Sequence, residues 1–369
     1  MNSAQPSLIN WSLAEKTAVT VIGAGPKLDR AQIAAEVAII RDAAAQAVGH
    51  VQQITGLDVT DRLHDSPTLV ADRATWIKAN IEGFQNLLDP VLRNVVQTKP
   101  ESFTETNLAV GGSSSGLEMG MILAFLGDKV LGQFEPFCGL GEGPNGGRLV
   151  LVAPNIVKVR EQLNVDARDF AMWVCLHEQT HRVQFAAAPW LREHMVALIR
   201  GLSDSLFASS GDMGTRIKDA LLGTKNELEQ RGAEDDIATK FSAQGLRKIL
   251  TEDQAAKFSE LTAIMSLMEG HANVVMDAVD SSIVSSVKTI RRRFNKRSEN
   301  LNAIEKFLRR LIGMDTKMRQ YQDGQKFVQH VVDQVGMEKF NAIWQRPQNL
   351  PTETEIHDPQ QWIDRVLGA

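Results

Sequence analysis

The sequence predicts a mainly α-helical fold with a small β element. Long segments carry apolar residues at the three-to-four-residue spacing of amphipathic helices, and β-branched runs are few. The best strand candidate is RLVLVAP at 148–154, which is bounded by glycines and a proline. With 43% hydrophobic residues, the 369-residue chain can bury a sizeable core.

The first part of the chain predicts two amphipathic helices and then an apolar one. Pro90 should kink or break the second, because proline removes a helix hydrogen bond. The segment GGSSSG is typical of a flexible connection, and a glycine-rich turn should end this part. The expected elements are helices at 31–55, 74–97 and about 117–134, the connection at 111–116 and the turn at 139–147. We expect residues 1–140 to form a helical cap packed on a core of residues 141–369.

The remainder predicts helices almost throughout, with a helical C-terminal region. Pro189 should end the first of them, and a proline-rich tail precedes a final WIDRVL turn. The expected helices lie at 167–188, 190–209, 214–230, 233–242, 252–280, 286–312 and 324–345.

Charge and composition exclude several classes of protein. The formal net charge is −5 and aromatic residues make up 6%, so neither a basic field nor stacking platforms for nucleic acid are expected. No apolar run is long enough to span a bilayer and no signal peptide is recognisable. Cys138 and Cys175 do not make a disulfide framework. We expect a cytoplasmic protein without nucleic-acid or membrane partners.

The motif that carries chemistry is His177-Glu178-Gln179-Thr180-His181, inside an apolar predicted helix. Residues four apart lie on one helix face, so the two imidazoles can converge on one ion at about 2.0–2.1 Å. Glu178 then lies beside the ion, where it can take a proton from bound water. These residues predict a Zn²⁺ site with Glu178 as the catalytic base. Arg182 is unusual, since a neutral residue is expected after the second histidine.

A catalytic zinc needs a third protein ligand. Gln184 and Ala187 stand where the metzincin extension requires glycine and histidine, so that class is excluded. Glu269, in the apolar segment SLMEGHANVVMDAV, is the favoured ligand because a lone acid there needs a cation. His271 and His194 are the rival ligands. Asn273 and Asp277 are candidates to orient a metal histidine.

Tyr321 is the chain's one tyrosine and a candidate donor to the oxyanion of a tetrahedral intermediate. His330 is a second candidate for that role. A core or surface role for either residue is the competing interpretation.

The segments HEQTHRVQF and LMEGHANVVMD resemble those of the zincin-like metallopeptidase type 2 family, a group of bacterial hydrolases. Some members are labelled as associated with deazaflavin-coenzyme biosynthesis. Stretches at 126–137, 313–328 and 341–366 are similar to that family too, so the resemblance covers most of the chain. It implies a zincin-like core, in which an HExxH helix is joined by a downstream glutamate helix in the gluzincin-like manner. It also implies His177, His181 and Glu269 as zinc ligands, with Glu178 as the base.

The expected function is a zinc-dependent hydrolase, foremost a metallopeptidase that cleaves peptide bonds with zinc-activated water. An edge strand at Arg148–Ala153 would bind an extended peptide by strand addition. Two alternatives remain open. One is a zinc hydrolase of a small non-peptide amide, and the other is a non-catalytic zinc protein that binds partners.

Overall fold

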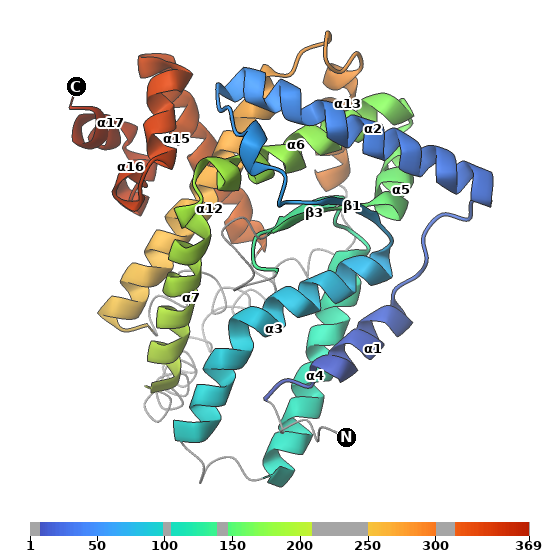
Figure 1. Ribbon diagram of the computed structural model, residues 1–369, viewed down its shortest axis with the longest axis vertical. Coiled ribbons are helices and arrows are strands. Elements are labelled where there is room, and N and C mark those ends of the chain that lie inside the picture. The colour runs from blue at the N-terminus through green and yellow to red at the C-terminus, as the bar shows by residue number, and fades with distance from the viewer. Residues whose placement is uncertain (1–7, 99–104, 139–146, 209–249, 300–313, 369) are drawn as a thin grey trace, which may run out of the picture. The chain divides into compact units, whose positions relative to one another are not determined.

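The computed structural model describes residues 8–98, 105–138, 147–208, 250–299 and 314–368 (Figure 1). They form many helices and one three-stranded sheet, which confirms the predicted fold class. These residues fall into two compact units. The first combines described residues of Met1–Arg192 with Val275–Phe294, and the second combines those of Glu193–Val274 with those of Asn295–Ala369. The expected division into a cap at 1–140 and a core at 141–369 stays a prediction.

The first unit contains the sheet and most of the long helices. Its helices are α1 (Trp11–Val21), α2 (Arg30–Thr55), η1 (Thr60–Arg62), α3 (Arg73–Thr98), α4 (Glu105–Gly127), α5 (Ala153–Leu163), α6 (Ala167–Ala187) and most of α13 (Val287–Glu299). The second unit holds most of α7 (Trp190–Ala208) and α12 (Glu252–Ala278), together with α15 (Met314–Phe340), η3 (Asn341–Trp344), η4 (Pro347–Asn349), α16 (Glu353–His357) and α17 (Pro359–Leu367).

The sheet has the strand order β1-β3-β2. Strand β1 (Thr68–Ala71) runs parallel to β3 (Arg148–Val152), and β2 (Gly132–Glu135) runs antiparallel to it. Helices α2 and α6 lie on one face and α3 on the other (Figure 1). The expectation that β3 is an edge strand is therefore wrong, because β3 is central and β2 is an edge strand. Strand β2 also contacts α6.

Strand β3 is central because its side chains suit burial on both faces. Leu149, Val150 and Leu151 are almost completely buried, which is typical of a strand covered on both sides. Leu149 and Leu151 belong to a hydrophobic cluster that also contains Leu176 of α6 and Val275 of α12. This cluster anchors α6 and the last turns of α12 to the sheet.

Two local predictions in the first 135 residues are wrong, and a third is wrong in part. The segment GGSSSG is not a connection but the middle of α4, because its glycines let α4 approach α1 closely: a Cβ on Gly116 would lie 2.5 Å from the Asn10 carbonyl oxygen. Helix α3 continues through Pro90, so the predicted break is wrong there, whereas the predicted kink stays a prediction. The apolar helix ends at Gly127, so Gly132–Glu135 is strand, not helix.

The other helix predictions agree with the structure where it describes them, except that the helix predicted at 324–345 is interrupted at Gly336 and ends in the 3-10 helix η3. The predicted segments 31–55, 167–188 and 252–280 correspond to α2, α6 and α12. The predicted turn at 139–147 apart from its last residue, the helices at 214–230 and 233–242, and the end of the 286–312 helix lie outside the described residues. Helices α1 and α5 and strand β1 were not predicted.

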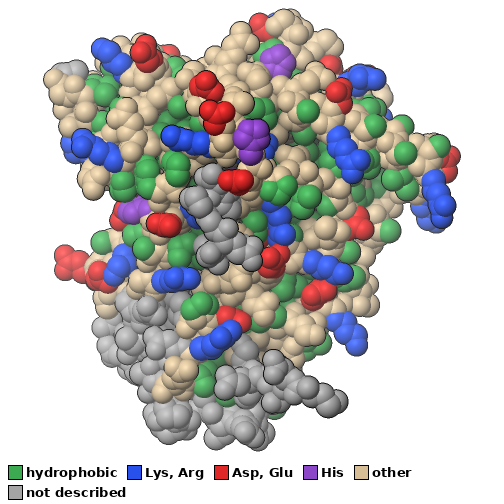
Figure 2. Space-filling model, viewed as in Figure 1, with side chains coloured by type: hydrophobic (Ala, Val, Ile, Leu, Met, Phe, Trp, Pro, Cys, Tyr) green, Lys and Arg blue, Asp and Glu red, His purple; other side chains and the backbone are tan. Residues whose placement is uncertain are grey.

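The visible surface carries charges of both signs, interspersed (Figure 2). Within the described residues, no helix is long and apolar enough to cross a membrane.

Candidate metal centre

Helix α6 presents the HEQTH motif. The Asp166 carboxylate caps its first turn by accepting hydrogen bonds from the backbone nitrogens of Arg168 and Asp169, at 2.8 and 3.0 Å. The helix ends at Ala187, two residues before Pro189. The cap and the buried apolar flank together hold the motif on a rigid helix.

The two histidines lie side by side on one face of α6. The ring centroids of His177 and His181 are 5.0 Å apart, with the ring planes almost perpendicular. Both side chains are half-buried. This is the one-turn spacing that lets two imidazoles share an ion.

Gln184 orients His181, a role that the sequence did not suggest. Its Oε1 lies 3.0 Å from His181 Nδ1, and the Gln184 side chain is completely buried. An amide oxygen can only accept, so Nδ1 carries the proton and Nε2 keeps its lone pair for a metal. The signal was present in the sequence, because Gln184 follows His181 by three residues on the same helix face.

Glu178 packs against the edge strand β2. Its side chain is 8% exposed, and a Cβ added to Gly132 would lie 2.7 Å from Glu178 Cγ. Glycine is therefore the residue that lets β2 come this close to α6. The contact holds the Glu178 side chain against the strand edge beside the two histidines.

Glu269 lies on helix α12. Val275 of α12 is in the same hydrophobic cluster as Leu176 of α6, and Glu269 precedes Val275 by six residues, about 9 Å along the helix. Among the described residues, His177, His181 and Glu269 are the one group of His, Cys, Asp and Glu side chains able to hold a metal, with ligand atoms all within 4.8 Å of one another. Two imidazole nitrogens and one carboxylate oxygen suit zinc and leave a fourth position open.

The rival ligands are not in that group. His271 is fully buried, with its ring stacked on Phe340 at 5.4 Å between centroids and tilted against Trp344 at 5.3 Å. His194 Nε2 lies 2.8 Å from a Glu260 carboxylate oxygen. The histidine that follows Glu269 by two residues is thus part of an aromatic core.

The remaining predicted residues have other surroundings. Asp277 is ion-paired with Arg291 at 2.9 Å, Asn273 is half-buried, and His330 is an exposed residue beside Gln334. The Tyr321 side chain lies outside the described residues.

Helix α15 meets α12 directly beside Glu269. A Cβ on Gly270 would lie 2.2 Å from the Gly324 carbonyl carbon, and one on Gly324 would lie 1.9 Å from the Ser266 carbonyl oxygen. The backbones of α12 and α15 are therefore in direct contact at Gly270. This contact prevents α12 from sliding along its axis next to Glu269, the proposed ligand.

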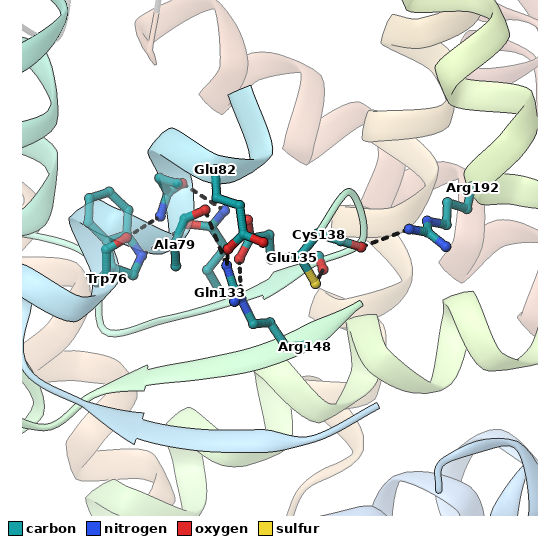
Figure 3. Close-up of polar contacts among 9 residues, drawn as sticks. Trp76, Ala79, Glu82, Gln133, Glu135, Cys138, Arg148 and Arg192 are labelled. Carbon is teal, nitrogen blue, oxygen red and sulfur yellow. Dashed lines mark hydrogen bonds and ion pairs between the residues drawn. The ribbon is translucent and has the colours of Figure 1, made fainter. Parts of the chain in front are cut away.

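The other face of β2 is held by a polar network (Figure 3). Arg148 of β3 donates through Nε to Glu135 at 2.8 Å and through Nη2 to Glu82 of α3 at 2.7 Å. Gln133 accepts from Trp76 Nε1 at 3.1 Å. Burial raises the pKa of Glu135 above its ordinary value, and the Arg148 hydrogen bond opposes that rise without cancelling it. These contacts hold β2 in the position in which Gly132 packs against Glu178.

Two further residues of α6 are not part of the metal face. Burial, reinforced by the charge of Glu178, raises the pKa of the Cys175 thiol far above its ordinary value, so this cysteine is an inert core residue. Arg182 points away from the histidines, and burial lowers its pKa.

Comparisons with known proteins agree with this arrangement. A family model described as zincin-like metallopeptidase matches residues 9–363. A solved structure described as "a putative hydrolase with a novel fold" from Chloroflexus aurantiacus is similar, with a TM-score of 0.64 and 29% sequence identity over 97% of this chain and 98% of that chain. No curated protein matches the chain. The extent of the family match leads to one conclusion: the chain belongs to the zincin-like metallopeptidase family.

Proposed function

We propose that this protein is a zinc-dependent hydrolase of peptide bonds. The observation that carries the proposal is the meeting of His177, His181 and Glu269 ligand atoms within 4.8 Å, with Glu178 as the neighbour of the first ligand. The family and the hydrolase description of the similar structure support it.

The protein side chains have separate tasks in this reaction. The two histidines and Glu269 would hold zinc, and Gln184 keeps His181 in the tautomer that binds through Nε2. Zinc bound there would polarise the substrate carbonyl and lower the pKa of a water molecule. Glu178 accepts the proton of that water and passes it to the leaving nitrogen. Tyr321 stays our candidate for hydrogen bonding to the oxyanion.

Among the described residues no strand pairs with the outer edge of β2, and this edge supports a peptide as the substrate. Leu131 O accepts from Val152 N at 2.8 Å, and the pairing alternates along antiparallel strands. The backbone groups of Gly132 and Phe134 therefore point away from β3, toward the outer edge. An extended peptide that adds to this edge as a strand would run past Glu178, which packs on Gly132.

The variant Glu178→Gln tests the catalytic proposal. It keeps the shape and removes the base, so we expect unchanged zinc content and a loss of peptide cleavage of at least about 10²-fold. Glu161→Gln, on the neighbouring helix α5, is the matched control and should behave as wild type. Equal cleavage by both variants would refute Glu178 as the base.

The substrate is tested by a peptide library beside a panel of small amides. Cleavage within library peptides supports the peptidase proposal. Turnover confined to small amides would favour the alternative hydrolase. Zinc binding without turnover of either substrate class, in wild type and Glu178→Gln alike, would favour a non-catalytic zinc protein.

A further inference from the structure

The face of α6 opposite the histidines borders a cavity. Successive helix residues are rotated by about 100°, so Gln179 and Arg182 project roughly opposite to His177 and His181. Gln179 Nε2 donates to the Ala44 carbonyl of α2 at 2.8 Å, which joins the two helices at this place. The cavity beside that bond has a volume of about 660 Å³, within the usual range for small-molecule sites.

Arg182 is held at this cavity by neutral groups alone. Its Nη2 donates to the Leu63 carbonyl at 2.7 Å and to the Ser66 carbonyl, its Nε donates to Ser66 Oγ at 3.2 Å, and its Nη1 donates to Gln179 Oε1 at 3.4 Å. Within the described residues, it has no carboxylate partner. A partly buried guanidinium without an anion is unfavourable, whereas one beside a carboxylate makes strong charge-assisted hydrogen bonds.

The rest of the lining fits an organic anion. Arg41 and His64 add a guanidinium and an imidazole, and no aspartate or glutamate that the structure describes lines the cavity. Asp61 of η1 and Asp65, which follows His64, lie outside the lining. Ala44, Val48 and Leu63 supply apolar walls.

We propose that this outer cavity binds a small carboxylic acid with an apolar body. The carboxylate would lie between Arg182 and Arg41, and the hydrocarbon part would lie against Val48 and Leu63. Apolar walls favour an organic carboxylate over inorganic phosphate, which needs polar partners around all its oxygens. This site is independent of the metal and of the proposed hydrolase activity. It also accounts for a charged residue directly after the second histidine of the motif.

The test compares hexanoate with hexanamide, which has the same length and no charge. Ligand-observed NMR on the full chain should show hexanoate binding with a Kd of about 1 mM or tighter, and at least tenfold weaker binding of hexanamide and inorganic phosphate. Equal binding of hexanoate and hexanamide, or no binding of hexanoate, would overturn the proposal.

Ala45 provides a matched pair of variants that locate the ligand. This residue lines the cavity and is exposed on α2, so the fold should tolerate a longer helix-forming side chain there. Ala45→Glu supplies a carboxylate at the rim and should weaken hexanoate binding at least tenfold, whereas Ala45→Gln should change it less than threefold. Hexanoate that coordinates the metal instead would bind both variants equally, and that result would refute the site.

Arg41→Met removes the exposed guanidinium without disturbing a described ion pair, and it should weaken hexanoate binding at least fivefold. Unchanged binding in this variant would contradict the proposed location of the carboxylate. Arg182→Met is less suitable because Arg182 also holds the loop at Ser66.

Discussion

Replacing Gly132 with alanine tests whether β2 positions Glu178, the proposed catalytic base. The added Cβ would lie 2.7 Å from Glu178 Cγ and 3.0 Å from Leu151 Cδ2. Ordinary contacts between carbon atoms are about 3.5–4.0 Å, so the Glu178 side chain must retreat by about 1 Å. A displacement of about 1 Å at a reacting group costs roughly 10²-fold in rate.

The assay is cleavage of the best peptide from the library, with zinc content measured on the same samples. We expect Gly132→Ala to retain zinc, since neither histidine moves, and to lose about 10²-fold in kcat. Gly111→Ala in α4 is the matched control, because an added Cβ there meets nothing within 4 Å. Wild-type kcat in Gly132→Ala, at equal zinc content, would refute the reasoning that β2 fixes the base.

Three other perturbations follow from single contacts. Arg148→Met leaves Glu135 buried without its partner and raises the pKa of Glu135 further. Urea unfolding should therefore give an unfolding free energy about 3–5 kcal/mol below that of wild type at neutral pH, and this difference should shrink as the solution is acidified toward pH 5. A difference that does not depend on pH would contradict this prediction. Gln184→Ala removes the acceptor of His181 Nδ1–H and should weaken zinc binding about 10–100-fold in chelator competition, whereas Gln184→Glu should bind zinc about as tightly as wild type. Equal zinc affinities of wild type and Gln184→Ala would exclude the orienting role. Burial raises the pKa of Asp169, but hydrogen bonds from Ser285 and Ser286 outweigh this effect and hold the pKa below its ordinary value. Wild type should therefore have a higher unfolding free energy than Asp169→Asn near neutral pH, and this difference should vanish as pH falls through about 4 and below. A difference that persists in acid would contradict the prediction.

The parts of the site that sequence could predict are those encoded by local spacing. The histidine pair needs only a helix and a four-residue interval, and α6 supplies both. Glu269 was recognisable because an acid in an otherwise apolar helix needs a compensating cation. Gln184 was equally local, because it follows His181 by three residues, but this spacing alone did not assign it a role before its distance to His181 was known.

The errors concern features that depend on distant partners. Strand order cannot be read from RLVLVAP, because the strands on either side of it lie about 15 and 80 residues earlier and are four residues long. GGSSSG lies within α4, where Gly116 comes close to Asn10 at the start of α1, and local composition does not reveal this approach. Local composition does not reveal the role of Gly132 either, because that role depends on the close approach of β2 to Glu178.

Diffraction at the zinc absorption edge from crystals of zinc-loaded protein tests the central claim most directly. We predict one strong anomalous peak about 2.0–2.2 Å from His177 Nε2, His181 Nε2 and a carboxylate oxygen of Glu269. A peak that excludes Glu269, or one held by His271 or His194 instead, would contradict the ligand set on which the proposed chemistry depends.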